Sequence, residues 1–437
     1  MRHVLITGFL FTVLTISALA QQQEAPLTLQ QKDEAIDSIV KTIKTRYIFP
    51  DVALKVEKYL RNRQAKNAYN AITGGNQFAQ VLTQDMQVAG NDKHLWAAYT
   101  PEELPVEKPR ELMSIPDEER AGLAEMFQRT NYGIDKLDIL KGNIGYLSFN
   151  TLISPEFAGE VYDAMMLYVA HTEALIIDLR KCGGSMSPDA VPYFCSYFFQ
   201  SPVHLNDTYF GKDAKLTQSW TYAHVNGRKY LNKPIYILTS RSTFSGAEEM
   251  AYDLQALKRA TVVGQPTGGG ANPGGIVRLT GHFRMFVPVG KVVNPITKSN
   301  WEHVGVQPDT VINARLALQK AQELAMLSSI KAANDDRWKG ALKDWMAEVV
   351  ASAPKLKPVT FELQGFENAK EVYVAGSFND WDQHASQMLR KGNKWVVVTE
   401  TEQGKTTYKF IVDGKWISDP GNAQTEGPNG DSVIVVE

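Results

Sequence analysis

The stretch Ile235–Glu249 (IYILTSRSTFSGAEE) constrains the fold more than any other, because it joins a strand to a helix through a short turn. Ile235–Thr239 is a short apolar run of the kind found in buried strands. Gly246–Leu257 has helical spacing, with acidic residues in its first turn and Lys258 and Arg259 after its end, which suits the helix dipole. The stretch therefore predicts a strand–turn–helix unit.

Ser245 lies at the junction of this strand and this helix. A hydroxyl on such a turn is exposed, and the amides at the start of the helix can stabilise an oxyanion. Serine is also a common helix N-cap, so a purely structural role stays open at this point. On local pattern, Ser245 is a candidate nucleophile.

The residues around this unit alternate between strand and helix patterns, which predicts an α/β domain. Apolar residues at helical spacing before it predict a small N-terminal helical bundle, and short alternating strands with turn signals after Pro354 predict an all-β sandwich. The predicted parts are a signal peptide (1–20), a helical bundle (21–100), a core (101–315), a helical connector (316–355) and a β-sandwich (356–437).

The first twenty residues have the pattern of a secretory signal peptide. Arg2 and His3 precede an apolar run, and Ala18-Leu19-Ala20 places small residues before a cut at Gln21. An uncleaved anchor is the alternative, but the run is short for a membrane span. No cysteine follows the cut, which argues against a bacterial lipid anchor. We expect an exported protein of the periplasm, cell surface or medium, with no membrane span after cleavage.

Composition excludes some classes of function. The formal net charge of the 437-residue chain is -2, so nothing indicates a nucleic-acid partner. The two cysteines, Cys182 and Cys195, are too few for a disulfide scaffold. They could pair with each other or remain buried free thiols.

Three separated stretches together resemble the tail-specific, or C-terminal processing, serine peptidases. They are IIDLRKCGG (Ile176–Gly184), the segment Thr243–Gly270, and WEHVGVQPD (Trp301–Asp309). With Asp92-Lys93-His94-Leu95, the chain is most similar to the branch that includes the tricorn core protease and interphotoreceptor retinoid-binding protein. The resemblance implies a Clp/crotonase-like superhelical core.

The resemblance also implies a catalytic arrangement. One branch of the family uses a lysine base in a glycine-rich loop, but Gly270 stands at that position here. The other branch uses histidine and glutamate, for which His94 and Glu302 are the matching residues. The resemblance thus implies that Ser245 is the nucleophile, His94 the general base and Glu302 the acid that orients the imidazole.

Glycines next to these residues match the expected oxyanion hole. The resemblance places it at the amide of Gly246 and an amide from Gly183 or Gly184. No metal or organic cofactor is expected, and the expected partner is a protein or peptide substrate.

The C-terminal part resembles the glycogen-binding modules of AMP-activated kinase β subunits and starch-branching enzymes. The resemblance rests on EVYVAGSFNDWD (Glu371–Asp382), YKFIVDGKWISDPGN (Tyr408–Asn422) and NGDSVIVV (Asn429–Val436). It implies an immunoglobulin-like sandwich and an α-glucan or other glycan partner. The implied sugar-binding residues are Trp381, Lys409, Trp416 and Asp431.

We therefore predict an exported serine peptidase with an accessory carbohydrate-binding module. Two other classes stay open: a non-catalytic protein that binds an apolar ligand on a peptidase scaffold, and a protein whose main function is carbohydrate binding. A hydrogen-bonded Ser245 and His94 would favour the peptidase. An exposed, coplanar Trp381–Trp416 pair would favour sugar binding.

Overall fold

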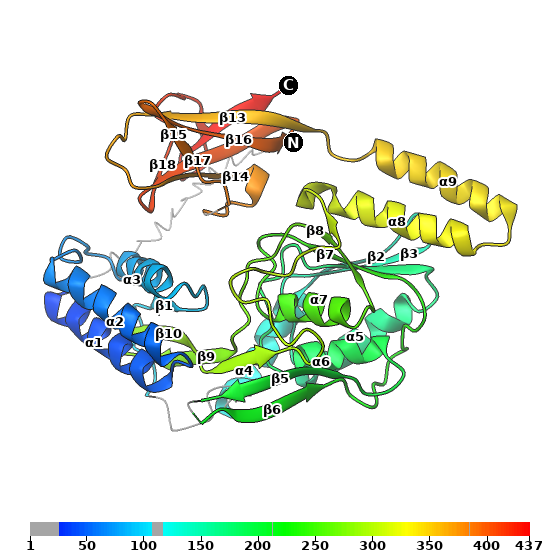
Figure 1. Ribbon diagram of the computed structural model, residues 1–437, viewed down its shortest axis with the longest axis horizontal. Helices are drawn as coiled ribbons and strands as arrows, with labels where there is room; N and C mark the ends of the chain where they lie inside the picture. The colour runs from blue at the N-terminus through cyan, green and yellow to red at the C-terminus, as the bar shows by residue number, and fades with distance from the viewer. Residues whose placement is uncertain (1–25, 107–116, 212, 384) are drawn as a thin grey trace, which may run out of the picture.

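A six-stranded sheet lies at the centre of the chain (Figure 1). The computed structural model describes residues 26–106, 117–211, 213–383 and 385–437, and the predicted signal peptide lies outside these ranges. Strands β3, β4, β7, β8 and β12 are parallel, and β2 is antiparallel at one edge. In sheet order the strands are β12 (Thr310–Val311), β8 (Thr261–Gly264), β7 (Ile235–Thr239), β4 (Ala174–Asp178), β3 (Ile144–Phe149) and β2 (Ile134–Leu140).

Helices cover both faces of this sheet, so β3, β4 and β7 are buried along their whole length. Alternate residues of β4 separate the two cores: Leu175 and Ile177 pack towards one set of helices, and Ile176 packs towards the other. The first set is α4 (Asp117–Arg129), α5 (Pro155–Tyr168), α6 (Ala190–Cys195) and α7 (Gly246–Ala256). The second set is α8 (Ala317–Ala332) and α9 (Asp336–Ala351).

Two small sheets flank the central one. The first consists of β11 (Gly290–Val293), β5 (His204–Phe210) and β6 (Lys215–Trp220). The second consists of β1 (Trp96–Tyr99), β10 (Phe283–Pro288) and β9 (Gly274–Arg278). The N-terminal helices α1 (Leu29–Arg46), α2 (Pro50–Ala65) and α3 (Gly75–Gly90) share one hydrophobic core with this second sheet. Residues far apart in the sequence therefore form one N-terminal unit.

The C-terminal module has two antiparallel sheets around a core of its own. One sheet contains β13 (Leu356–Gln364), β16 (Lys394–Glu402) and β15 (Leu389–Lys391). The other contains β14 (Val372–Gly376), β17 (Gly404–Val412), β18 (Lys415–Ile417), β19 (Thr425–Glu426) and β20 (Asp431–Val436). Short 3-10 turns complete the order: η1 (Asn131–Gly133), η2 (Ser196–Phe198), η3 (Ala314–Leu316) and η4 (Ser377–Asn379).

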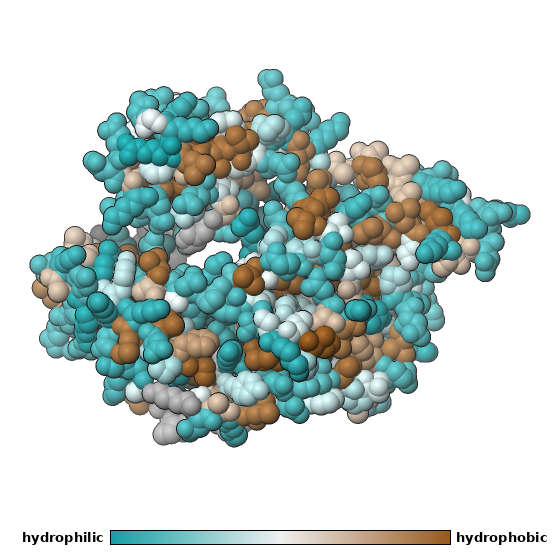
Figure 2. Space-filling view, in the orientation of Figure 1, coloured by the Kyte–Doolittle hydropathy of each residue, from teal (hydrophilic) through white to brown (hydrophobic). Residues whose placement is uncertain are grey.

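The mixed α/β class with a C-terminal β-sheet domain is confirmed. Elements with polar, half-exposed sequences have no counterpart in the sequence prediction. These are β2, β5, β6 and α4; β6, for example, is exposed at nearly every position, and four of its six residues are polar. On the face shown in Figure 2, apolar residues occur in small separate groups among hydrophilic ones. Within the ranges that the structure covers, each helix is too short or too polar to cross a bilayer.

A matched pair of isoleucines tests the central sheet. Ile177 on β4 is fully buried, whereas Ile139 on the edge strand β2 is 41% exposed. We expect Ile177→Ala to lower the free energy of unfolding by about 2–5 kcal/mol, because it leaves a cavity between packed layers. Ile139→Ala should cost less than about 1 kcal/mol. Equal losses in urea denaturation would contradict the assignment of β2 to the sheet edge.

Candidate active site

Ser245 lies on a strained turn between β7 and α7. Its backbone has φ 53° and ψ -123°, a conformation that a residue with a side chain rarely adopts. The turn is tied to the neighbouring strand end, because Phe244 N–H donates to Cys182 O at 3.1 Å and Thr243 Oγ1 donates to Leu179 O at 2.7 Å. These contacts hold the serine hydroxyl at the end of the parallel strands.

His94 faces this serine from the N-terminal unit. Its Nε2 lies 3.1 Å from Ser245 Oγ, across 151 residues of sequence. The imidazole packs against the rings of Phe244 and Phe286, with centroid distances of 4.6 and 5.5 Å. Burial lowers the pKa of His94 to about 4, against an opposing effect of the Asp92 charge. The ring is therefore neutral at physiological pH and can accept a proton from the serine.

The backbone around His94 is fixed by Asp92. Its Oδ1 accepts from His94 N–H at 2.8 Å, and its Oδ2 accepts from Tyr47 OH at 2.8 Å. Tyr47 follows α1 and is buried in the core of the N-terminal unit. The position of the imidazole thus depends on the packing of the N-terminal helices.

Glu302 reaches the same region from the loop after β11. Its Oε2 accepts from Ala271 N–H at 2.5 Å, in the glycine-rich loop that also touches the His94 ring. Burial, and then the charge of Asp92, raise the pKa of Glu302 to about 8. The structure shows no hydrogen bond between Glu302 and His94 in the residues described.

Buried polar atoms without a hydrogen-bond partner gather in this region. Within the described ranges they include His94 Nδ1, Glu302 Oε1 and both side-chain polar atoms of Asn272. Such atoms are rare in folded proteins, and they concentrate where a site has a function beyond stability. Of these atoms, His94 Nδ1 can donate a hydrogen bond and Glu302 Oε1 can accept one.

The glycine-rich loop approaches His94 too closely for any side chain at Gly270. A Cβ there would lie 2.7 Å from His94 Cε1 and would overlap the ring of Phe244. A lysine at this position would displace the histidine, so the two bases exclude each other in this packing.

Two of the three glycines predicted for the oxyanion hole leave their amides available. Gly184 has φ 131°, and a Cβ on it would lie 2.9 Å from Ser245 Cβ and 3.4 Å from Gly246 N. Gly184 therefore packs closely against Ser245 and the start of α7, and neither the Gly184 nor the Gly246 amide has an acceptor among the described residues. The Gly183 N–H donates to Asn150 O at 3.1 Å, so this geometry does not support a role for Gly183.

Sequence analysis missed the residue that holds these parts together. Glu248 is fully buried and accepts hydrogen bonds from the N–H groups of Ser245 (2.9 Å), Gly269 (2.6 Å) and Gly270 (2.9 Å) and from the Thr267 hydroxyl. Burial nevertheless raises its pKa to about 7, against the effect of these bonds. Ser245-x-x-Glu248 has the spacing of a capping box, which could have revealed the contact.

The two cysteines are free and buried in the structure. Burial raises the pKa of Cys182 to about 12, so its thiol is not activated although it lies two residues from Gly184. Across the described ranges, no group of three or more His, Cys, Asp or Glu side chains could hold a metal ion.

The residues predicted to bind sugar lie in two contacting pairs. The rings of Trp381 and Trp416 are 6.2 Å apart with an angle of 43° between their planes, so they are tilted rather than coplanar. Lys409 Nζ donates to Asn429 O at 2.5 Å and lies 3.6 Å from Asp431 Oδ1. The lysine already has protein partners that a sugar hydroxyl would need to share.

Three family models match the chain. Residues 143–312 match peptidase family S41, and residues 16–130 match the N-terminal domain of this family in eukaryotic IRBP. Residues 357–437 match the glycogen recognition site of AMP-activated protein kinase. Together the matches extend from the N-terminal unit through the active-site region to the C-terminal module.

Curated relatives match a short part of the chain. The β-1 subunit of 5'-AMP-activated protein kinase from Rattus norvegicus is 39% identical over 74 residues, which is 17% of this chain and 26% of the relative. The human β-1 subunit gives the same identity and coverage. The chain thus spans about a quarter of the length of these relatives.

Solved structures match the larger part of the chain at low identity. A lipoprotein from Streptococcus agalactiae is 16% identical, with 67% of this chain and 96% of that chain covered and a TM-score of 0.44. The photosystem II D1 C-terminal processing protease is 13% identical, with 66% and 95% covered and a TM-score of 0.40.

Adjacent glycines offer a matched test of the site. We expect Gly184→Ala to lower the rate at which a fluorophosphonate labels Ser245 by about 10²–10³-fold, because the new Cβ collides with the serine and displaces an amide donor. A Cβ at Gly183 meets open space, so Gly183→Ala should stay within about threefold of the parent rate. Equal rates for two folded variants, measured by mass spectrometry, would contradict the assignment of Gly184.

Proposed function

Because the chain belongs to peptidase family S41 and is therefore a serine-type peptidase, we propose that it cleaves peptide bonds through an acyl-enzyme at Ser245. His94 acts as general base and Glu302 orients the imidazole. The 3.1 Å contact between His94 Nε2 and Ser245 Oγ, on a strained turn, carries this proposal. A peptidase core of the crotonase type and an immunoglobulin-like module belong to the same proposal.

The proposed reaction begins with neutral His94. The ring accepts the Ser245 proton as the hydroxyl attacks the scissile carbonyl, and it later donates that proton to the leaving amine. Negative charge develops on the carbonyl oxygen, where the Gly184 and Gly246 amides can donate. Each such donor typically contributes about 3–4 kcal/mol to transition-state stabilisation.

Glu302 supports the charged imidazole in this proposal. Its Oε1 and the His94 Nδ1 are buried and lack hydrogen bonds among the described residues, so a hydrogen bond between them would satisfy both. His303 Nδ1, at 3.7 Å, is the one ionic neighbour of this Oε1 in the described ranges. Only the ionised carboxylate stabilises the imidazolium by charge. Because the pKa of Glu302 is raised to about 8, we infer that this support strengthens as pH rises through 8.

The module serves the peptidase in this proposal by holding an α-glucan or another glycan. The tilt of Trp381 and Trp416 gives two ring faces at an angle, which suits a curved chain of sugars better than a flat one.

The predicted signal peptide at residues 1–20 supports export to the periplasm, cell surface or medium. The substrate is then an exported protein or peptide.

Covalent labelling tests the nucleophile and its base. We expect a fluorophosphonate to label the mature protein at Ser245, as located by peptide mapping, and Ser245→Ala to abolish the label. His94→Ala should lower the labelling rate by about 10³-fold or more, since His94 is the side chain that hydrogen-bonds the Ser245 hydroxyl in the described residues. His224→Ala is the matched control, because His224 is an exposed histidine whose hydrogen bond goes to Asn226, outside the candidate site.

Two outcomes would count against this assignment. Unchanged labelling of a folded His94→Ala variant would reject His94 as the base while keeping the enzyme. A folded parent protein that resists labelling from pH 5 to pH 10 would favour the non-catalytic, apolar-ligand alternative.

The pH dependence of labelling tests Glu302 separately. With a pKa of about 4, His94 is neutral throughout the neutral range, so the rate should instead rise with an apparent pKa near 8 as Glu302 ionises. Glu302→Gln should remove this rise and lower the rate at pH 9 by about 10²–10⁴-fold. Glu103→Gln, at an exposed glutamate, is the control. A rise near pH 8 that persists in Glu302→Gln would reject the assigned role.

A further inference from the structure

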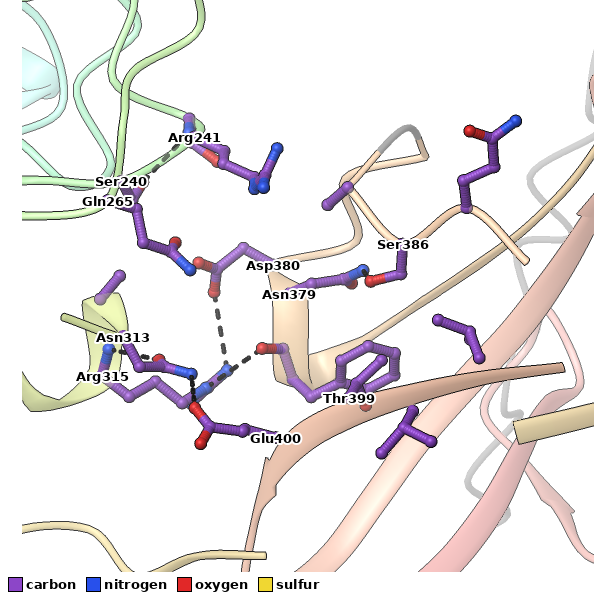
Figure 3. Close-up of a pocket in the computed structure, with 17 residues that line it drawn as sticks. Ser240, Arg241, Gln265, Asn313, Arg315, Asn379, Asp380, Ser386, Thr399 and Glu400 are labelled. Carbon is purple, nitrogen blue, oxygen red and sulfur yellow. Dashed lines mark hydrogen bonds and ion pairs between the residues drawn. The ribbon is translucent and has the colours of Figure 1, made fainter. Parts of the chain in front are cut away.

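A pocket of about 330 Å³ lies at the junction of the peptidase part and the C-terminal module (Figure 3). We call it the junction pocket. Its peptidase wall is formed by residues 240–242, 265 and 313–315, and its module wall by residues 378–380, 385–387 and 397–400. Its volume is near the lower end of the range of about 300–1,000 Å³ that ligand pockets occupy. Ser245, Trp381 and Trp416 are not among the residues that line it.

Arg315 holds the two walls of the junction pocket together. Its guanidinium donates to the carbonyls of Ser377 and Phe378 and lies 3.8 Å from Asp380 Oδ1 and 3.4 Å from Glu402 Oε2. Because this one side chain contacts four groups of the module, it fixes the position of the module wall relative to the peptidase wall before any ligand binds. A preformed pocket loses less entropy when it binds a small ligand.

The charges that line the junction pocket balance. Arg241 and Arg315 are opposed by Asp380 and Glu400, so the pocket offers no net attraction to an anion or a cation. Figure 3 shows basic and acidic side chains facing one another across the space. Ionised carboxylates accept hydrogen bonds and guanidinium groups donate them, so a neutral ligand with many hydroxyl groups can use both kinds.

Some of this hydrogen-bonding capacity is unused by the protein. The side chains of Arg241 and Gln265 make no hydrogen bond or ion pair with the described parts of the chain. Figure 3 shows the Gln265 amide directed into the space between the walls, opposite Asp380. An amide can donate and accept at once, which suits a vicinal pair of hydroxyl groups.

The module wall adds an apolar strip beside these polar groups. Val397 and Val398 of β16 line the pocket together with Phe378, and Val398 is 60% exposed although it is aliphatic. Sugar rings combine apolar C–H faces with polar edges, and they bind where an apolar surface borders donors and acceptors. The lining of the junction pocket has this combination.

We propose that the junction pocket binds a neutral mono- or disaccharide unit, as a second glycan site that only the peptidase part and the module together complete. The unit rests on Val398 and exchanges hydrogen bonds with Gln265, Arg241 and Asp380. Binding at this site does not require the proposed peptidase activity.

The peptidase wall of the pocket belongs to the turn that carries the nucleophile. Ser240 N–H donates to Thr243 Oγ1 at 3.0 Å, and Ser242 N–H donates to Ser240 Oγ at 3.0 Å. Ser245 follows on the same turn. A sugar bound at Ser240–Ser242 therefore stabilises a segment that positions the serine, which links glycan occupancy to the active site.

Hydrogen exchange on the full mature protein tests this site. The probes are maltose, cellobiose and lactose at up to roughly 10 mM, ten times a 1 mM dissociation constant. We expect at least one sugar to slow amide exchange both in residues 240–242 and in residues 397–400. Protection of the module alone, or of neither segment with all three sugars, would overturn the proposal.

Variants separate the junction pocket from the tryptophan pair. Gln265→Ala should weaken binding at residues 240–242 by roughly 3–10-fold and leave any protection near Trp416 unchanged. Trp416→Ala should leave the protection at residues 240–242 in place. Gln200→Ala, at an exposed glutamine outside the pocket, is the matched control. Parent-like protection in Gln265→Ala, or protection by sodium phosphate but by none of the sugars, would reject a sugar site.

Discussion

The buried carboxylate of Glu248 is the constraint on which the candidate site depends. It accepts from Ser245 N–H, which supports the strained backbone of the turn, and from the amides of Gly269 and Gly270, which hold the glycine-rich loop against that turn. Glu248 has no exposed surface, and burying a carboxylate costs free energy unless its oxygens accept hydrogen bonds. The same bonds that satisfy it therefore fix the turn and the loop relative to each other.

His94, the second part of the candidate site, belongs to the N-terminal unit. His94 is held by Asp92 and, through Asp92, by Tyr47 in the core of the N-terminal helices. Those helices pack on the β1–β10–β9 sheet, two strands of which come from the chain between the glycine-rich loop and Glu302. Placement of the imidazole thus depends on the packing of the N-terminal unit, and a mutation in that core should affect both.

Local pattern predicted more of the backbone than of the site. The run Ile235–Thr239 is strongly apolar, so its place as a buried strand followed from sequence, whereas β6 is polar and exposed and carried no such signal. Ser245 followed from a strand–helix junction, but its contact with His94 spans 151 residues, which no local periodicity encodes. The hydrogen bond that occupies Gly183 N–H and the tilt of the tryptophan pair depend on tertiary packing in the same way.

The absence of a side chain at Gly270 makes room for a histidine beside Ser245. The space that a side chain would need there is filled by His94 and Phe244, so the ring can approach Ser245 only because the loop carries glycine. Burial of that ring lowers its pKa to about 4, which keeps it neutral at physiological pH, but it also raises the free energy of the protonated ring that the proposed mechanism requires. The charge of Asp92 offsets part of this cost, and the proposed mechanism assigns further support to an ionised Glu302. The closer packing that a glycine permits therefore requires a carboxylate partner if histidine is to serve as the base.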